Sequence, residues 1–115
     1  MSLLTAVKDS HMLVISKKVC PNCVKLKSLL QEAGITYHSV VIEDYMEMVD
    51  DDDRVFDEIE YLKNKYKITS YPMVFIGSEH IEGGYHELRR QDELGVLAGY
   101  MKGKNVSMKG DATEF

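Results

Sequence analysis

The chain has 115 residues and a net charge of −5, and 44% of its residues are hydrophobic, as in a single globular domain. The acidic balance argues against a nucleic-acid-binding protein, which usually carries a basic patch, and no apolar run approaches the roughly 20 residues of a membrane span. Since the start of the chain lacks a signal-peptide pattern and two cysteines are too few for a disulfide framework, we expect one cytoplasmic, monomeric domain over residues 1–115 that binds neither nucleic acid nor membranes.

The chain opens with a predicted short helix and a predicted buried strand. Leu3, Leu4 and Val7 suit one face of the opening helix. Residues 11–16 form a largely continuous apolar run, which is typical of a strand covered on both faces, as in the centre of a parallel sheet. We expect the folded core to begin with this strand and to cover about residues 11–102.

A helix and a second strand follow and complete a βαβ unit. Pro21 suits the first helical position and Gly34 suits the residue just past the helix end. The apolar stripe of this helix is formed by Cys23, Leu26, Leu29, Leu30 and Ala33. Residues 35–42 are rich in β-branched residues and predict a strand. A strand, a helix and a strand over about 30 residues form one βαβ unit.

The next segment, residues 43–60, is acidic, with ten acids and one base, Arg54. Its block Asp50–Asp53 predicts a solvated loop that ends as a helix N-cap, because aspartates cap backbone N–H groups and oppose the helix dipole. The helix that follows has apolar side chains at helical spacing, namely Val55, Ile59, Leu62 and Tyr66. A docking surface for a basic partner is the second interpretation of the acidic segment.

The last third of the chain predicts two strands and one helix. Residues 73–76 form a short apolar strand, and residues 80–82 suit its hairpin partner after a turn. The apolar positions of a single final helix are Leu88, Leu94, Leu97 and Met101. Residues 103–115 show no periodicity, and we expect a mobile tail there.

Cys20 and Cys23 are the only cysteines of the chain, and Pro21 and Asn22 stand between them. A Cys-x-x-Cys pair at the first turn of a βαβ unit is typical of a redox-active dithiol. Cys20 lies at a predicted helix N-terminus, which stabilises the attacking thiolate, and Lys17 adds positive charge nearby. Cys23, one turn further, can resolve a mixed disulfide. A structural zinc site would need two more ligands, and the four histidines stand at no recognised spacing.

Four signals in this order resemble the glutaredoxin family. They are Lys17, the motif Cys20-Pro21-Asn22-Cys23, Ser70-Tyr71-Pro72 before a strand, and Gly83-Gly84-Tyr85-His86-Glu87 before a helix. The resemblance covers about residues 12–101. It implies an α/β, thioredoxin-like fold, with a central four-stranded mixed sheet flanked by helices.

The resemblance also implies roles for the matching residues. The nucleophile, the resolving cysteine and a cis-proline that faces the dithiol correspond to Cys20, Cys23 and Pro72. The residues that would bind glutathione are Lys17, Asn22, Tyr71, Pro72, Gly84, Tyr85 and His86. Backbone N–H groups after the paired glycines would receive the γ-glutamyl carboxylate of glutathione. No metal is expected.

Three departures from the family pattern concern glutathione and the choice of partner. Asn22 stands where the family usually has tyrosine or phenylalanine, and Tyr71 stands where it has valine. The helix position that often carries glutamine or arginine for the glycine carboxylate of glutathione falls on Ile59. Lys63, one helical turn further, is a candidate substitute. The dithiol chemistry depends on none of these positions.

The leading hypothesis is a glutathione-dependent thiol–disulfide oxidoreductase that serves electron transport and cell redox homeostasis. It would reduce protein disulfides and glutathione mixed disulfides, and ribonucleotide reductase is a partner suggested by the family. One alternative is a glutaredoxin-like dithiol carrier reduced by thioredoxin reductase. Another is an iron–sulfur-binding glutaredoxin, against which Pro21 and Cys23 argue.

Overall fold

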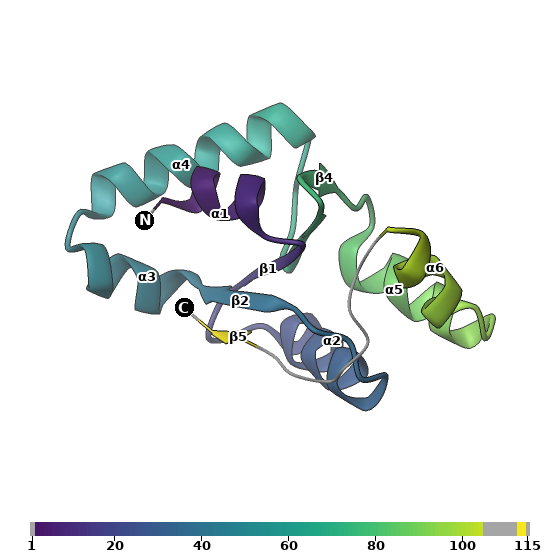
Figure 1. Cartoon of the computed structure of the whole chain (residues 1–115). Helices are drawn as coiled ribbons and strands as arrows, with labels where there is room; N and C mark the ends of the chain where they lie inside the picture. Colours follow the sequence, from purple (N-terminus) through teal and green to yellow (C-terminus); the bar gives the residue numbers. More distant parts are fainter. Residues whose placement is uncertain (1, 105–112, 115) are drawn as a thin grey trace.

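The computed structural model describes residues 2–104 and 113–114, and its centre is a mixed β-sheet (Figure 1). The strands are β1 (Met12–Ser16), β2 (His38–Val41), β3 (Met73–Ile76), β4 (Glu79–His80) and β5 (Thr113–Glu114). Their order across the sheet is β4-β3-β1-β2-β5. Strand β1 is parallel to β2 and antiparallel to β3. The predicted mixed sheet of four strands is confirmed, and β5 adds a two-residue strand beside β2.

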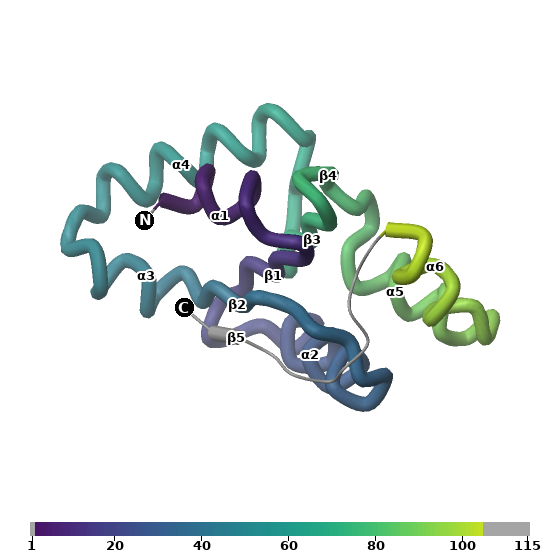
Figure 2. Tube along the Cα trace, in the orientation of Figure 1, coloured from purple at the N-terminus to yellow at the C-terminus, as the bar shows by residue number. Residues whose placement is uncertain are grey.

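Helices cover both faces of this sheet. They are α1 (Leu3–Asp9), α2 (Pro21–Glu32), α3 (Ile42–Val49), α4 (Asp52–Tyr66), α5 (Gly84–Glu93) and α6 (Leu97–Gly103). Within the described residues, none of them combines the length and apolarity needed to cross a membrane. Helices α1, α3 and α4 pack on one face, and α2, α5 and α6 pack on the other (Figures 1 and 2).

The central strand β1 contributes to both cores. Leu13 and Ile15 belong to the core under α1, α3 and α4, whereas Met12 and Val14 belong to the core under α2, α5 and α6. Successive side chains of a strand point to opposite faces, so a strand covered on both faces is apolar throughout. The continuous apolar run that predicted a buried central strand therefore has this physical origin.

Helix α2 begins and ends where the sequence predicts. Cys20 is its N-cap, and Pro21 occupies the first turn. Just past the helix, Gly34 has a φ of 71°, a left-handed conformation that glycine adopts at little cost. Cys23 and Leu26 face the core. Because α2 follows directly on β1, both cysteines lie at the carboxyl end of the central strand.

Two expectations for the first 42 residues need correction. Helix α1 buries Leu3, Ala6 and Val7, whereas Leu4 is 38% exposed. Residues three and four apart share one face of a helix, so Ala6 and Val7 lie on the same face as Leu3, whereas Leu4 is turned about 100° away from Leu3. Strand β2 covers only His38–Val41 of the predicted range 35–42, and α3 begins directly after it.

Helix α3 lies inside the acidic segment and was not predicted. Its residues Ile42 and Tyr45 are buried, and Met46 and Val49 pack against the same core. This spacing is that of an amphipathic helix. Solvent-facing acids surround these apolar positions, so the acidic composition hides the helical spacing in the sequence.

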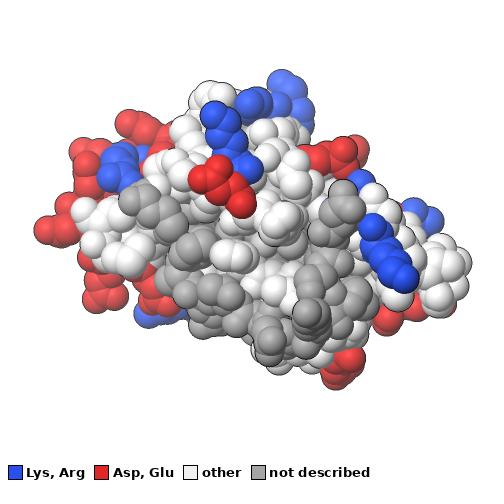
Figure 3. Space-filling view, viewed as in Figure 1, with Lys and Arg blue, Asp and Glu red and all other residues white. Residues whose placement is uncertain are grey.

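Helix α4 begins as predicted within the aspartate block. The carboxylate of Asp51 accepts a hydrogen bond from the backbone N–H of Arg54 at 3.1 Å, which is an N-cap contact. The predicted stripe along α4 is confirmed, since Val55, Ile59 and Leu62 are buried. Figure 3 shows acidic side chains gathered at the end of the molecule where α3 meets α4.

The predicted final helix is in fact two helices. Helix α5 ends at Glu93 and α6 begins at Leu97, and Gly95 between them has a φ of 72°. Leu97 is buried as expected, but Leu94 is 61% exposed. The left-handed glycine ends the first helix, which lets α6 fold back along α5 and bury its own apolar face.

Of the predicted tail at 103–115, the structure describes only the end of α6 and strand β5. Thr113 and Glu114 pair with His38 and Ser39 of β2. Residues 105–112 and 115 lie outside the described residues, so the mobility of the tail stays a prediction.

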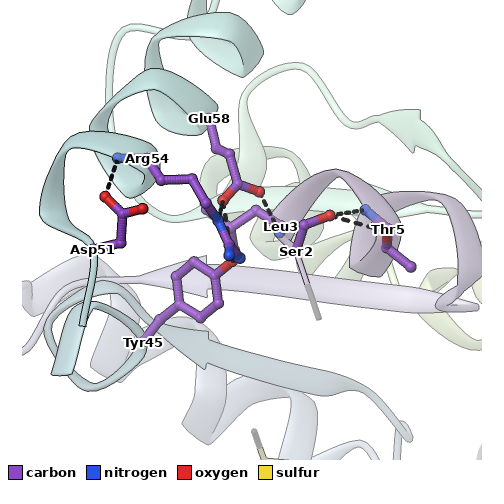
Figure 4. Close-up of polar contacts among 7 residues, drawn as sticks. All are labelled: Ser2, Leu3, Thr5, Tyr45, Asp51, Arg54 and Glu58. Carbon is purple, nitrogen blue, oxygen red and sulfur yellow. Dashed lines mark hydrogen bonds and ion pairs between the residues drawn. The ribbon is translucent and has the colours of Figure 1, made fainter. Parts of the chain in front are cut away.

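A buried carboxylate, Glu58, ties α1 and α3 to α4 (Figure 4). The backbone N–H of Leu3 donates to its Oε2 at 2.7 Å, and the Tyr45 hydroxyl donates to its Oε1 at 3.1 Å. Arg54 donates from Nε to the same Oε1 at 3.2 Å and from Nη2 to the Tyr45 oxygen at 2.9 Å. Glu58 is 7% exposed, and these partners replace the hydrogen bonds to water that its charge loses on burial.

Glu58→Gln should lower the free energy of unfolding by about 2 kcal/mol. The amide would place an N–H₂ group opposite one of the donors that both carboxylate oxygens now satisfy. Urea unfolding followed by far-UV circular dichroism measures the loss. The control is Glu60→Gln, an exposed position on the same helix, which we expect to leave stability unchanged; equal losses in both variants would contradict the role of Glu58.

Candidate active site

The redox centre is the turn between β1 and α2. The Sγ atom of Cys20 accepts a hydrogen bond from the backbone N–H of Cys23 at 3.2 Å. The two sulfurs form a disulfide, and their Cα atoms are 5.2 Å apart. Cys23 is 2% exposed, whereas Cys20 is partly exposed. An external disulfide can therefore reach Cys20, while Cys23 can act from behind it.

The surroundings of Cys20 favour a thiolate once the disulfide is reduced. The unpaired N–H groups and the dipole of a helix N-terminus stabilise an anion. The N–H of Cys23 already points at the Cys20 sulfur, and a hydrogen bond to the charged form favours that form. Because the thiolate is the species that attacks disulfides, this turn is suited to favour the reactive form of Cys20.

A groove of about 390 Å³ opens beside Cys20. The predicted residues Lys17, Asn22 and Tyr71 line it, and Lys63 of α4 joins them. The Lys17 Nζ lies 4.5 Å from the centre of the Tyr71 ring, and the Lys63 Nζ lies 5.6 Å from it. The groove therefore combines a reachable sulfur with two cations and an aromatic ring.

A second hollow of about 230 Å³ adjoins this groove and shares Asn22 and Tyr71 with it. The other predicted residues that line it are Pro72, Gly84, Tyr85 and His86. Every site residue predicted from the sequence thus lines one of these two adjoining hollows, except Cys23, which is buried behind Cys20.

The wall of the second hollow is built from Pro72 and Gly84. The Tyr71–Pro72 peptide bond is cis, as predicted. Gly84 has a φ of 46°, and a Cβ atom there would lie 3.0 Å from the carbonyl oxygen of Pro72. Only glycine combines that conformation with such a close approach, so the start of α5 can lie against the proline loop.

Some of the groups predicted to contact glutathione already have partners inside the protein. Tyr85 is 8% exposed and its side chain belongs to the core under α2, α5 and α6. The backbone N–H of Gly84 donates to the Ile81 carbonyl at 3.1 Å, and that of His86 donates to the Gly83 carbonyl at 2.9 Å. The N–H of His86, one of the groups after the paired glycines that were expected to receive a carboxylate, therefore closes the turn in this structure, as does the N–H of Gly84.

Two acidic residues of α3 contact the loop before Cys20, and neither was among the predicted site residues. The Glu43 carboxylate accepts a hydrogen bond from the backbone N–H of Lys18 at 3.0 Å, and Asp44 lies 3.4 Å from the Lys18 Nζ. Both acids stand in the first turn of α3. The apolar spacing of α3 was the available signal, and recognising that helix would have placed these acids beside the redox turn.

A larger hollow of about 590 Å³ lies between α1 and α4. Its lining includes Leu4, Tyr61 and Lys65, and neither cysteine lines it. It also reaches Ser78, which lies beyond the end of β3 that is remote from Pro72. The smaller groove beside Cys20 is therefore the place where disulfide chemistry can occur.

A family model for glutaredoxin matches residues 12–81, more than half of the chain. This chain belongs to the glutaredoxin family. Glutaredoxins are thiol–disulfide oxidoreductases, and Cys20 and Cys23 are the redox-active pair of this one. No curated protein sequence matches the chain significantly.

The solved structures similar to this glutaredoxin have the same thioredoxin-like fold. A wheat glutaredoxin is 22% identical with a TM-score of 0.72, over 90% of this chain and 89% of the wheat chain. A buckwheat glutaredoxin in complex with glutathione is 22% identical with a TM-score of 0.69, over 88% and 84%. A dithiolic glutaredoxin of Trypanosoma brucei brucei is 24% identical with a TM-score of 0.68, over 88% and 96%. At this sequence identity, the similarity to these structures shows a shared fold.

The structure shows where the residues of α4 that depart from the family pattern lie in this glutaredoxin. Ile59 is 6% exposed and belongs to the hydrophobic core, so it does not face a ligand. Lys63, one turn further along α4, lines the groove beside Cys20. The structure thus places a cation at the groove from a helix position that the family pattern does not use.

His80 makes the stability of this glutaredoxin pH-dependent. Its ring lies 5.4 Å from the Phe75 ring and 5.9 Å from the Tyr66 ring, and burial lowers its pKa despite the opposing charge of Glu82. The folded state therefore favours neutral histidine. Stability from this group is complete above the unfolded-state pKa of about 6.5 and declines as the pH falls through that value.

We expect His80→Gln to flatten the decline in stability between about pH 7.5 and 5.5. Urea unfolding at a series of pH values measures the slope for the wild type and the variant. His11→Gln, at an exposed position before β1, is the matched control and should keep the wild-type slope. A His80→Gln slope equal to that of the wild type would contradict the assignment.

Proposed function

We propose that this glutaredoxin uses glutathione to reduce protein disulfides and protein–glutathione mixed disulfides. The observation that carries the proposal is the pair of adjoining hollows that runs from Cys20 past Tyr71 and Pro72 to Gly84. Its shape suits an extended tripeptide whose central sulfur meets Cys20. The site also has cations for the carboxylates of such a peptide, since Lys17 and Lys63 line the Cys20 groove.

The glutathione moiety would lie along the two hollows in an extended form. Its cysteinyl backbone would pair with the backbone of Tyr71, as in the addition of a short strand. Its glycine carboxylate would lie near Lys17 and Lys63. Its γ-glutamyl end would lie toward Gly84 and His86. A buckwheat glutaredoxin of the same fold forms a complex with glutathione, which supports glutathione as the ligand.

Removal of glutathione from a protein would follow two exchange steps. The Cys20 thiolate attacks the glutathione sulfur of the mixed disulfide, forms a Cys20–glutathione disulfide and releases the protein thiolate, which takes up a proton. A second glutathione thiolate then attacks the bound glutathione sulfur. Oxidised glutathione leaves and the Cys20 thiolate is restored. The net reaction consumes one free glutathione and converts the mixed disulfide to the protein thiol and oxidised glutathione.

Reduction of a protein disulfide would use both cysteines. Cys20 attacks one substrate sulfur and releases the first substrate thiolate. The Cys23 thiolate then attacks the Cys20 sulfur, releases the second substrate thiol and leaves the Cys20–Cys23 disulfide, the oxidation state in this structure. Two glutathione molecules would reduce that disulfide again, with NADPH and glutathione reductase upstream.

The remaining proposals concern the cellular setting. We propose a cytoplasmic, monomeric protein, because a catalytic dithiol works as a reductant in a compartment that keeps thiols reduced. Its partners would be disulfide-containing or glutathionylated proteins, with ribonucleotide reductase as a candidate by family analogy. Purification followed by light scattering, and fractionation of the source cells, test these two properties directly.

The decisive experiment is NADPH consumption in the presence of glutathione, glutathione reductase and a glutathione mixed-disulfide substrate. Wild-type protein should give robust turnover that requires glutathione. The same protein is assayed with NADPH and thioredoxin reductase in place of the glutathione system. Turnover in the second assay alone would overturn the proposal and leave the disulfide chemistry intact.

A carrier reduced by thioredoxin reductase is the second candidate, and two observations favour it. Ile59 is buried where the family often has a ligand-binding side chain. The N–H of His86, one of the groups that would receive the γ-glutamyl carboxylate, is engaged in the turn. Glutathione would have to bind with fewer backbone contacts than the resemblance implies, which lowers its affinity and favours a protein reductant.

A further inference from the structure

Two lysines meet over one aromatic ring at the Cys20 groove. Lys17 comes from the loop after β1, Lys63 from α4, and Tyr71 from the loop before β3. Their Nζ atoms lie 4.5 and 5.6 Å from the ring centre, within the roughly 6 Å of an attractive cation–π contact. One side chain, at a position where the family pattern has valine, therefore joins the loop after β1 to α4 and to the loop before β3.

The charge of this groove opposes that of the chain. The chain carries a net charge of −5, yet the described lining of the groove includes Lys17 and Lys63 and no acidic residue. Neither lysine forms an ion pair with another described residue. Two ammonium groups thus line the groove beside the redox sulfur, and no described carboxylate forms an ion pair with either.

The ring of Tyr71 is suited to hold these two cations. Burial, and then the negative charges of Glu43 and Glu60, raise the pKa of its phenol, so the ring stays neutral at physiological pH. A flexible lysine loses side-chain entropy when it is fixed on a ligand. A rigid ring that already holds the ammonium reduces that loss, which is the general advantage of preorganisation.

We propose that Tyr71 is a specificity-determining residue that positions Lys17 and Lys63, so that the groove selects disulfides with carboxylates close to the reacting sulfur. The inference rests on disulfide exchange at Cys20 and holds whether glutathione or a reductase supplies the electrons. The preferred substrates are acidic peptides or small dicarboxylate disulfides. Neutral and cationic disulfides of the same length react more slowly.

The test is the reaction of pre-reduced protein with two small disulfides in a single turnover. Dithiodipropionate carries two carboxylates, and bis-hydroxyethyl disulfide is its neutral analogue of similar length. Each reaction converts the protein dithiol to a disulfide and the small disulfide to two thiols, so no other reductant is needed. Acid quenching and mass spectrometry of the protein give both rate constants, and their ratio measures the selectivity.

Wild type should prefer the dicarboxylate about fivefold, and added salt should reduce the preference. Tyr71→Val should abolish most of it, and Tyr71→Phe, which retains the ring, should keep it. Lys63→Ala should cost less selectivity in the Tyr71→Val background than in the wild type, because the two side chains act together. Lys65→Ala is the control, since Lys65 lies over Tyr61 and Tyr66 at the α1–α4 hollow, away from Cys20.

The outcomes separate this inference from the function itself. Equal rates for both disulfides in the wild type, or an unchanged preference in Tyr71→Val, would overturn the role of Tyr71 and leave the oxidoreductase intact. An equal loss in Tyr71→Phe and Tyr71→Val would assign the effect to the hydroxyl and overturn it as well. A wild type that reduces neither disulfide would overturn the exchange at Cys20, and the inference with it.

Discussion

Cys20→Ser should reduce disulfide exchange by this glutaredoxin to the uncatalysed background. A serine hydroxyl is not ionised near neutral pH and forms no mixed disulfide. Cys23 cannot replace it, because Cys23 is 2% exposed. The measurement is glutathione-coupled NADPH consumption at equal protein concentrations, with far-UV circular dichroism to confirm the fold. Activity above background would mean that Cys20 is not the nucleophile.

The companion variant, Cys23→Ser, should keep one of the two proposed activities and lose the other. Removal of glutathione from a mixed disulfide needs Cys20 and free glutathione, so this activity should remain. Reduction of a protein disulfide needs an internal thiol to release the bound substrate, so this activity should fall to background. Mass spectrometry should detect substrate trapped on Cys20. Full reduction of protein disulfides by this variant would contradict the resolving role of Cys23.

Gly84→Ala should lower the free energy of unfolding by about 3 kcal/mol, since a left-handed conformation and an overpacked contact are combined at one residue. The new Cβ would lie 3.0 Å from the Pro72 carbonyl oxygen, at a φ of 46°. That oxygen belongs to the backbone of the proline loop and cannot rotate away. Urea unfolding measures the loss. The rate of disulfide reduction should also fall, because α5 would shift and its residues would no longer line the second hollow as they do now.

Two other glycines separate the causes of this loss. Gly95 has a φ of 72°, and nothing lies within 4 Å of the position that a Cβ atom would take, so Gly95→Ala measures the conformational cost alone. Gly99 lies within α6 with open space around it, and Gly99→Ala should be neutral or stabilising by about 0.5–1 kcal/mol. A Gly84→Ala loss no larger than that of Gly95→Ala would contradict the close-packing argument.

The features that sequence analysis predicted well are those with local causes. A strand covered on both faces must be apolar throughout, and β1 shows that pattern in consecutive residues. The start of α2 is set by Pro21 and by the capping sulfur of Cys20, which are neighbours in the chain. The dithiol was predictable because it lies where these two local signals meet.

The errors arose where two local signals conflicted. In α3 the apolar residues have helical spacing, but the surrounding acids and the aspartate block that follows favour a loop. Between α5 and α6 the leucines continue at helical spacing, and Gly95 interrupts the helix. In α3 packing against the sheet decided the outcome, because burying an apolar face stabilises a helix more than local propensity does. Between α5 and α6 the left-handed Gly95 decided it.

The sequence by itself determined the fold class, the redox pair and which residues would surround it. The redox pair follows from the Cys-x-x-Cys spacing at a strand-to-helix turn, which involves a few consecutive residues. The thioredoxin-like fold and the residues around the pair follow from the resemblance to the glutaredoxin family. Only the tertiary structure decided that Lys17 and Lys63 meet over Tyr71 and that Glu58 receives the N–H of Leu3. Those contacts join residues from separate segments, and their geometry exists only once the sheet has brought the segments together.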